Sequence, residues 1–155
     1  MSFPLYGFTE TMRGTWTPLD GSGRKTLWFR AEADVTDAGA YLKHGRLSLS
    51  GALHAEGLAD EVPARGHLEI QPLSRRIGYE LDFTADDGRR CRFVGEKTPS
   101  LRHLLKSMTT LPGDVLDADG KRLGTALLYF DLKNDLVPFL GTFRRGRRAL
   151  IEVGP

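Results

Sequence analysis

Hydrophobic and polar residues alternate along most of the chain, a spacing that is typical of β-strands with one buried face. The clearest example is the stretch from Gly66 to Lys97, in which three strand-like segments are separated by turn residues. In its middle segment Tyr79 and Leu81 fall on one face, and Glu80 and Asp82 fall on the other. This meander predicts the centre of an antiparallel β fold.

The same alternation predicts strands in five further segments: Tyr6 to Thr17, Lys25 to Val35, Gly45 to Gly57, Thr109 to Leu116 and Lys121 to Leu132. In the last of these, Leu123, Leu127 and Tyr129 share a face, and we expect Leu127 to point into the interior. Turn signals such as Asp86-Asp87-Gly88 separate the strands and indicate hairpin connections.

A few segments break the alternation. Thr36 to Lys43 predicts one short helical turn, capped by its first or second residue. Ser100 to Met108 has leucines at helical spacing and predicts a second helix. Near the C-terminus, Asn134 is a candidate cap for a last short helix, and Arg147 to Val153 is either a final strand or a loose tail.

These segments together predict an all-β, mostly antiparallel fold of about eight to nine strands with one or two short helices. Strands follow one another through short turns without the strand–helix–strand alternation of a parallel sheet. A closed barrel and a two-layer sandwich each solve the problem of exposed sheet edges, so both remain open at this point.

Composition fits one globular domain over residues 1–155. Hydrophobic residues make up 40% and charged residues 27%, which is ordinary for such a protein. The net charge is only +2, and much of the excess positive charge lies in four arginines close to the C-terminus: Arg144, Arg145, Arg147 and Arg148. Residues 144–155 are therefore either a solvated basic tail or a patch for an anionic surface. No aromatic platform surrounds the arginines, so nucleic acid is not an expected partner.

The single cysteine, Cys91, excludes an internal disulfide. It alternates with Phe93 on a strand, which favours a buried inert thiol over a nucleophile. The N-terminal residues lack the basic start and apolar run of a signal peptide, and no run reaches the roughly 18 apolar residues of a membrane span. We therefore expect a cytoplasmic protein.

Catalytic and cofactor signatures are missing from the sequence. It contains no dinucleotide fingerprint, P-loop, nucleophile elbow or zinc-protease motif, and its four histidines have no metal-ligand spacing. Two acidic pairs, Asp86 with Asp87 and Asp117 with Asp119, precede glycines in turns, where turn chemistry explains them. We expect no metal, no cofactor and no catalytic residue, so a protein without catalytic activity of its own.

Two charged residues share the apolar phase of their strands. Glu10 lies among apolar neighbours on the first strand, and Lys97 follows Phe93 and Gly95 on another. In one interpretation both lie near strand ends and reach solvent. In the other they are buried or line a cavity, where they fix the polar end of a ligand.

Two family resemblances extend this interpretation. Gly14-x-Trp16 is similar to the opening G-x-W of lipocalins, which are closed eight-stranded barrels with an apolar cavity. The segment FTETMRG at Phe8–Gly14 resembles the F-x-E-x-M-x-G motif of an accessory region in cholesterol-oxidase-like members of the glucose–methanol–choline flavoprotein family. Matches in the same order follow at Arg75–Lys97, in the TTL triplet after residue 108, and in GTALLYFDL with the following FLGTFR.

The flavoprotein resemblance implies only the accessory module. The chain lacks the dinucleotide fingerprint of the flavin-binding domain and is too short to hold that domain. Oxidase activity, flavin and catalytic residues are therefore not carried over, although a separate flavoprotein oxidoreductase becomes a candidate partner.

The first functional hypothesis is a β domain that binds a hydrophobic small molecule. The candidate ligand-binding residues are Glu10, Arg30, Tyr79, Lys97 and Leu127, and the expected apolar lining also includes Leu27, Phe29, Leu49 and Leu81. The alternative is a protein-interaction or self-association module, in which Trp16 and Trp28 lie exposed on strand faces opposite the core. An enzyme with an unrecognised site ranks last, because no nucleophile–base pair can be named.

Overall fold

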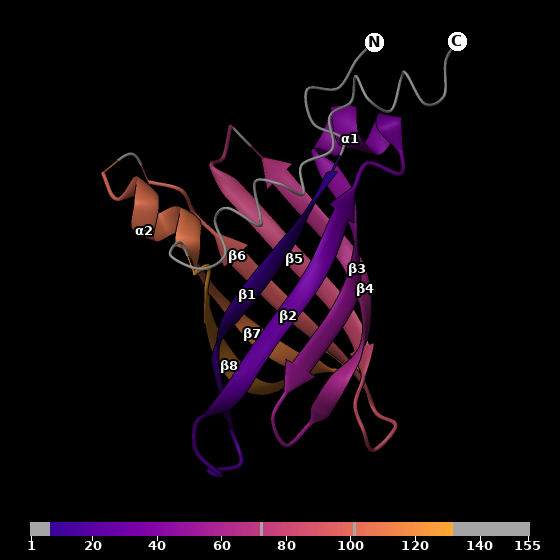
Figure 1. The fold of residues 1–155 in the computed structure, drawn as a ribbon, viewed down its shortest axis with the longest axis vertical. Coiled ribbons are helices and arrows are strands. Elements are labelled where there is room, and N and C mark those ends of the chain that lie inside the picture. Colours follow the sequence, from indigo (N-terminus) through magenta and orange to yellow (C-terminus); the bar gives the residue numbers. More distant parts are fainter. Residues whose placement is uncertain (1–6, 72, 101, 132–155) are drawn as a thin grey trace.

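The computed structural model describes residues 7–71, 73–100 and 102–131, which form a closed barrel of eight antiparallel strands (Figure 1). The strands are β1 (Gly7–Pro18), β2 (Lys25–Asp34), β3 (Arg46–Ala55), β4 (Ala59–Gln71), β5 (Arg76–Thr84), β6 (Arg90–Lys97), β7 (Thr110–Asp117) and β8 (Arg122–Tyr129). Helix α1 (Ala38–His44) connects β2 to β3, and α2 (Leu104–Thr109) connects β6 to β7. The predicted antiparallel fold is confirmed, and of the two proposed architectures the barrel is the correct one.

Each strand pairs with the next in sequence, and β8 pairs with β1 to close the sheet. Closure leaves no exposed sheet edge, which removes the main route to strand-mediated aggregation. The predicted alternation is confirmed on β2 and β5: Leu27, Phe29, Leu81 and Phe83 are buried. A single apolar core therefore fills the barrel.

The two ends of the barrel differ. Because consecutive strands are antiparallel, all odd-numbered strands begin at the same end. We call this the helix end, because α1 and α2 both lie there (Figure 1). The opposite end, the turn end, carries the connections β1–β2, β3–β4, β5–β6 and β7–β8.

Helix α1 forms where the sequence predicts it. Its N-cap is Asp37, whose Oδ1 accepts a hydrogen bond from the Ala40 N–H at 3.1 Å. It ends at Gly45, which has a φ of 64°, the left-handed conformation that favours glycine. The second helix is shorter than the predicted Ser100–Met108 segment and begins only at Leu104. The features predicted at Asn134, 144–155 and 147–153 lie outside the described residues.

The interior phase predicted for the last strand is wrong. Leu127 is 38% exposed on the outer face of β8, whereas Ala126 and Leu128 face inward. Both faces of this strand carry apolar residues, so the alternation alone does not identify the inner one. The pairing with β7 identifies it, because Leu128 lies opposite the buried Leu111 and Gly124 lies opposite the buried Val115. The register between neighbouring strands therefore sets the phase.

The interaction hypothesis requires Trp16 to be exposed on the outer face, and this prediction is wrong. It is 4% exposed and shares the inward phase of Met12, because both occupy even positions on β1. Its indole Nε1 donates to the Glu56 carbonyl oxygen at 3.2 Å. Trp16 therefore belongs to the core at the turn end.

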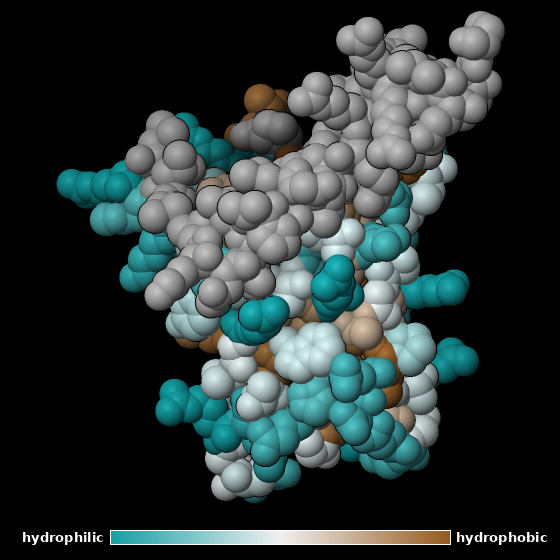
Figure 2. Space-filling model, viewed as in Figure 1, coloured by the Kyte–Doolittle hydropathy of each residue, from teal (hydrophilic) through white to brown (hydrophobic). Residues whose placement is uncertain are grey.

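The outer face of the barrel is largely polar. Figure 2 shows hydrophilic side chains over most of the visible lower barrel, with apolar side chains between them. Ion pairs such as Arg92–Asp82 and Arg46–Glu69 connect neighbouring strands on this face. In the part of the chain that the structure describes, no helix is long and apolar enough to cross a bilayer.

Candidate functional site: a charged cluster inside the barrel

Three polar side chains meet inside the barrel near the helix end. Glu10 comes from β1, Tyr79 from β5 and Lys97 from the last position of β6. The Tyr79 hydroxyl donates to Glu10 Oε1 at 2.5 Å, and Lys97 Nζ lies 3.3 Å from Glu10 Oε2. The Lys97 ammonium also lies 5.1 Å from the centre of the Tyr79 ring, a favourable cation–π distance. We call these three residues the charged cluster.

Burial sets this cluster apart from the other ion pairs. Glu10 is 7% exposed and Lys97 is 4% exposed, and they are the only buried charged residues in the described ranges. The interpretation in which both reach solvent near strand ends is therefore wrong, although both do lie near strand ends. Strand geometry explains the result, because each has the inward phase of its strand.

The carboxylate of Glu10 also affects its tyrosine partner. Burial is the largest cause that raises the pKa of Tyr79 well above its ordinary value of 10.0, and the charge and hydrogen bond of Glu10 add to it. The phenol therefore keeps its proton over the physiological range. It acts in the cluster as a hydrogen-bond donor to Glu10.

The barrel is packed solid beneath the cluster. Met12, Phe29 and Phe93 have no accessible surface, and the ring centres of Phe29 and Phe93 are 5.8 Å apart. Leu27 and Leu81, expected to line a cavity, are also fully inaccessible and belong to this core. The small exposed surface of the cluster therefore opens toward the helix end and not toward the barrel centre.

A hollow of about 520 Å³ lies at the same end of the barrel, between α1 and the β4–β5 hairpin. Tyr41 and Leu42 of α1 and Ile70 of β4 give it apolar walls. Ile70 and Tyr41 also pack against the barrel core, so these walls are continuous with the core. The hollow offers apolar surface near the mouth of the barrel.

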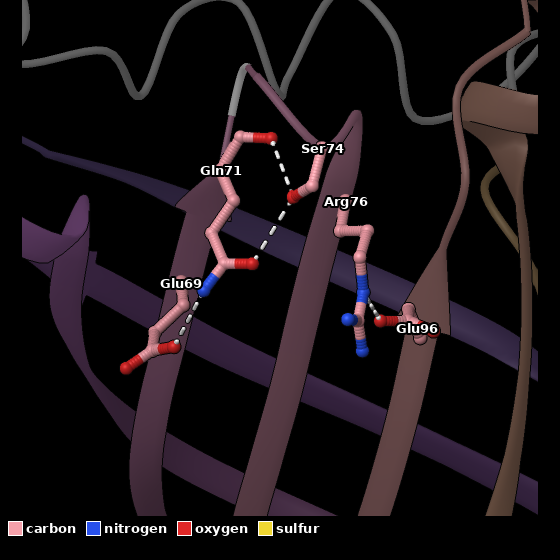
Figure 3. Close-up of polar contacts among 5 residues, drawn as sticks. All are labelled: Glu69, Gln71, Ser74, Arg76 and Glu96. Atoms are coloured by element: carbon pink, nitrogen blue, oxygen red, sulfur yellow. Dashed lines mark hydrogen bonds and ion pairs between the residues drawn. The ribbon is translucent and has the colours of Figure 1, made fainter.

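The hairpin beside this hollow is held by its own hydrogen bonds (Figure 3). The Ser74 hydroxyl lies 3.2 Å from Gln71 Oε1, and Gln71 Nε2 donates to Glu69 Oε2 at 3.4 Å. Arg76 pairs with Glu96 on the adjacent strand. Gln71 and Ser74 line the hollow, so one of its walls is ordered by polar contacts on the surface.

Two other candidate residues lie elsewhere. Arg30 is exposed on the outer face of β2, because Phe29 and Ala31 on either side of it point inward. It therefore cannot orient a ligand inside the barrel. Trp28 has the predicted outward phase but is only half-exposed, and its ring stacks on His54 with centres 5.9 Å apart. Part of its aromatic face is thus already covered.

The sequence identified the members of the cluster but not their contact. Glu10, Tyr79 and Lys97 share an inward phase on three strands, and that shared phase was the available signal. The hollow at the helix end was missed, since it depends on how α1 packs. Also missed was a hollow of about 780 Å³ at the turn end, lined by Arg65, Arg90 and other residues of β4 to β7 and of the β7–β8 turn.

Cys91 lines that second hollow but does not resemble a nucleophile. Its side chain is buried, as predicted, and burial is the largest cause that raises the pKa of its thiol. Among the described residues, no group of three histidine, cysteine, aspartate or glutamate side chains is placed to hold a metal ion.

Comparison with known proteins adds no assignment: no family model or curated sequence matches the chain, and no solved structure matches its fold.

Proposed function

We propose that the protein binds a small molecule with an apolar body and a polar end, and that the binding site is the helix end of the barrel. The observation that carries this proposal is the charged cluster of Glu10, Tyr79 and Lys97. Burial of an ammonium and a carboxylate costs several kcal/mol of desolvation per ion, which their attraction offsets only partly. Apolar residues of similar volume would stabilise the same position at least as well.

The arrangement of apolar and polar groups supports this proposal. Drug-sized ligands bind in sites that are mostly apolar and contain a few convergent polar groups. Here the polar groups converge at the cluster, while Ile70, Ile77 and Phe8 supply apolar surface nearer the strand ends. The hollow beside α1 extends that apolar surface outward. We propose that the polar end of a ligand reaches the cluster and that its body lies against these apolar walls.

Tyr79 of the cluster is not arranged for a hydrolytic or nucleophilic reaction. The phenol of Tyr79 remains protonated and its hydrogen is directed at Glu10, so it is not poised as a base. We therefore propose binding without chemistry. A separate flavoprotein oxidoreductase, the partner that the sequence resemblance implies, is a candidate source or acceptor of the ligand.

Native mass spectrometry tests this proposal on the protein purified from its own host, before and after extraction with organic solvent. We expect an additional mass of a few hundred daltons that extraction removes. A matched variant, Glu10→Gln/Lys97→Met, replaces the charged groups by neutral groups of similar shape and should be recovered without that mass. An identical bound mass in both proteins would place the ligand elsewhere.

The alternative function, an interaction module, retains one supporting observation. Leu127 and Tyr129 are exposed on the outer face of β8, 38% and 49% respectively, next to Pro112 on β7. Such a patch is of the kind that contacts proteins. Leu127→Ser/Tyr129→Ser should change the oligomeric state or abolish partner capture if this face is an interface, and should change neither if the ligand hypothesis alone is correct.

A further inference from the structure

The hydrogen-bonding capacity of the charged cluster indicates which chemical group it receives. A lysine ammonium has three donors and no acceptor, whereas a carboxylate only accepts. Glu10 uses one oxygen for Tyr79 and the other for Lys97. Among the described residues, no second acceptor lies within hydrogen-bond distance of Lys97 Nζ. A buried ammonium with spare donors calls for a further acceptor, and a bound ligand can supply one.

The charge balance of the cluster limits what that acceptor can be. The Lys97 ammonium already lies against the Glu10 carboxylate, so the pair has no net charge. A ligand carboxylate bound to Lys97 would place two anions against one cation in a buried site. An uncharged oxygen acceptor satisfies the spare donors without that repulsion.

From these two observations we infer that the site selects an uncharged ligand with a carbonyl oxygen, such as a ketone on an apolar skeleton, and discriminates against carboxylates. This inference rests on the proposed function and specifies its ligand class. The carbonyl oxygen accepts from Lys97 Nζ, and Glu10 compensates the ammonium charge. Lys97 is thus the specificity-determining donor, and Glu10 excludes acids.

The test is a competition among three matched compounds. The wild-type protein is dialysed at pH 8 against an equimolar mixture of 2-undecanone, decanoate and undecane, and the bound fraction is extracted and quantified by gas chromatography. We expect 2-undecanone to be enriched about tenfold or more over undecane, the usual effect of one hydrogen bond to a charged group. Decanoate should be depleted relative to the ketone by a similar factor.

One variant reverses the predicted selectivity. Glu10→Gln keeps an oxygen that accepts from Tyr79 but removes the charge that compensates Lys97. We therefore expect decanoate to become the preferred compound. The control, Glu96→Gln on the outer face of β6, changes the net charge of the protein equally and should retain the wild-type preference. Circular dichroism verifies the fold of each variant, and the wild-type competition decides the inference even if Glu10→Gln does not fold.

The outcomes separate the inference from the proposed function. Equal binding of all three compounds, or preference of the wild-type protein for decanoate, would overturn the inference while leaving a ligand-binding barrel. If the protein retains none of the three compounds, both the inference and the proposed function are overturned. A Glu10→Gln variant that folds and still prefers the ketone would contradict the role assigned to Glu10.

Discussion

The two ends of the barrel are closed in different ways. At the turn end the large ring of Trp16 packs over Gly124, and its only polar atom donates to the Glu56 carbonyl oxygen. At the helix end the interior instead contains the charged pair of Glu10 and Lys97, and Glu10 is the one acceptor for this ammonium among the described residues. The turn end is therefore closed by an apolar ring whose polar atom is paired, whereas the helix end holds a buried ion pair.

This difference separates stability from function within one barrel. Packing of apolar side chains is the usual means of stabilising an interior, and the layer of Met12, Phe29 and Phe93 shows that this chain uses it fully at the barrel centre. A buried ion pair a few residues away does not serve that purpose well. The helix end is accordingly where we expect recognition, and the turn end is where we expect stabilisation.

The largest expected effect comes from the turn end. Trp16→Ala removes a buried ring and should lower the free energy of unfolding by about 3–5 kcal/mol, the range for large aromatic residues in cores. Trp28→Ala is the matched control, because its ring lies half-exposed on the outer face, and it should cost about 1 kcal/mol. Urea unfolding followed by circular dichroism measures both; equal losses would contradict the assignment of Trp16 to the core.

A pair of variants at the helix end should show that the charged cluster contributes little net stability. Lys97→Met leaves the Glu10 carboxylate buried without its cation and should cost about 3–5 kcal/mol. Adding Glu10→Gln removes the remaining charge and should restore stability to within about 1 kcal/mol of wild type.

The same urea unfolding experiment measures this pair. If the double variant remains as unstable as Lys97→Met, the ion pair is a stabilising element, and the contrast between the two ends fails.

Tyr79 gives a smaller effect and a pH dependence. Tyr79→Phe leaves Glu10 Oε1 without its donor and should cost about 1.5–3 kcal/mol at neutral pH. The pKa of Tyr79 is raised in the folded protein, so its contribution to stability is fully present below the ordinary value of 10.0 and declines as the pH rises above it.

Alkaline unfolding followed by tyrosinate absorbance tests this. In the wild-type protein one phenol should ionise only when the barrel unfolds, and Tyr79→Phe should lack that step. Ionisation of every tyrosine near pH 10 in the folded wild-type protein would place Tyr79 in water.

The smallest effect concerns the hollow beside α1. Asp37→Ala removes the N-cap of this helix and should cost about 1 kcal/mol, with several-fold weaker binding of 2-undecanone. Asp87→Ala is the control at the turn end, where Asp87 Oδ1 accepts from the Arg89 N–H in the β5–β6 turn. It should lower stability without affecting binding. Equal loss of binding in both variants would exclude a specific role for α1.

The sequence predicted the fold better than the site, for reasons that individual strands illustrate. On β2 and β5 one face is apolar and the other polar, so the alternation gave the correct inward residues. On β8 both faces carry apolar residues, and the register against the buried residues of β7 identifies the inner one. Glu10, Tyr79 and Lys97 were identified singly, but their meeting depends on barrel closure, which places β1 opposite β5 and β6. Alternation within a strand does not encode that distance.

The most direct test of the account is where a ligand binds. Nuclear magnetic resonance of the protein titrated with 2-undecanone, labelled with ¹³C at the carbonyl carbon, reports both the site and the contact. We predict that the carbonyl resonance shifts as its oxygen accepts from Lys97, and that side-chain signals of Tyr79 and Ile70 change while the indole signal of Trp16 does not. Changes centred on Trp16, or none at saturating ketone, would contradict a recognition site at the helix end.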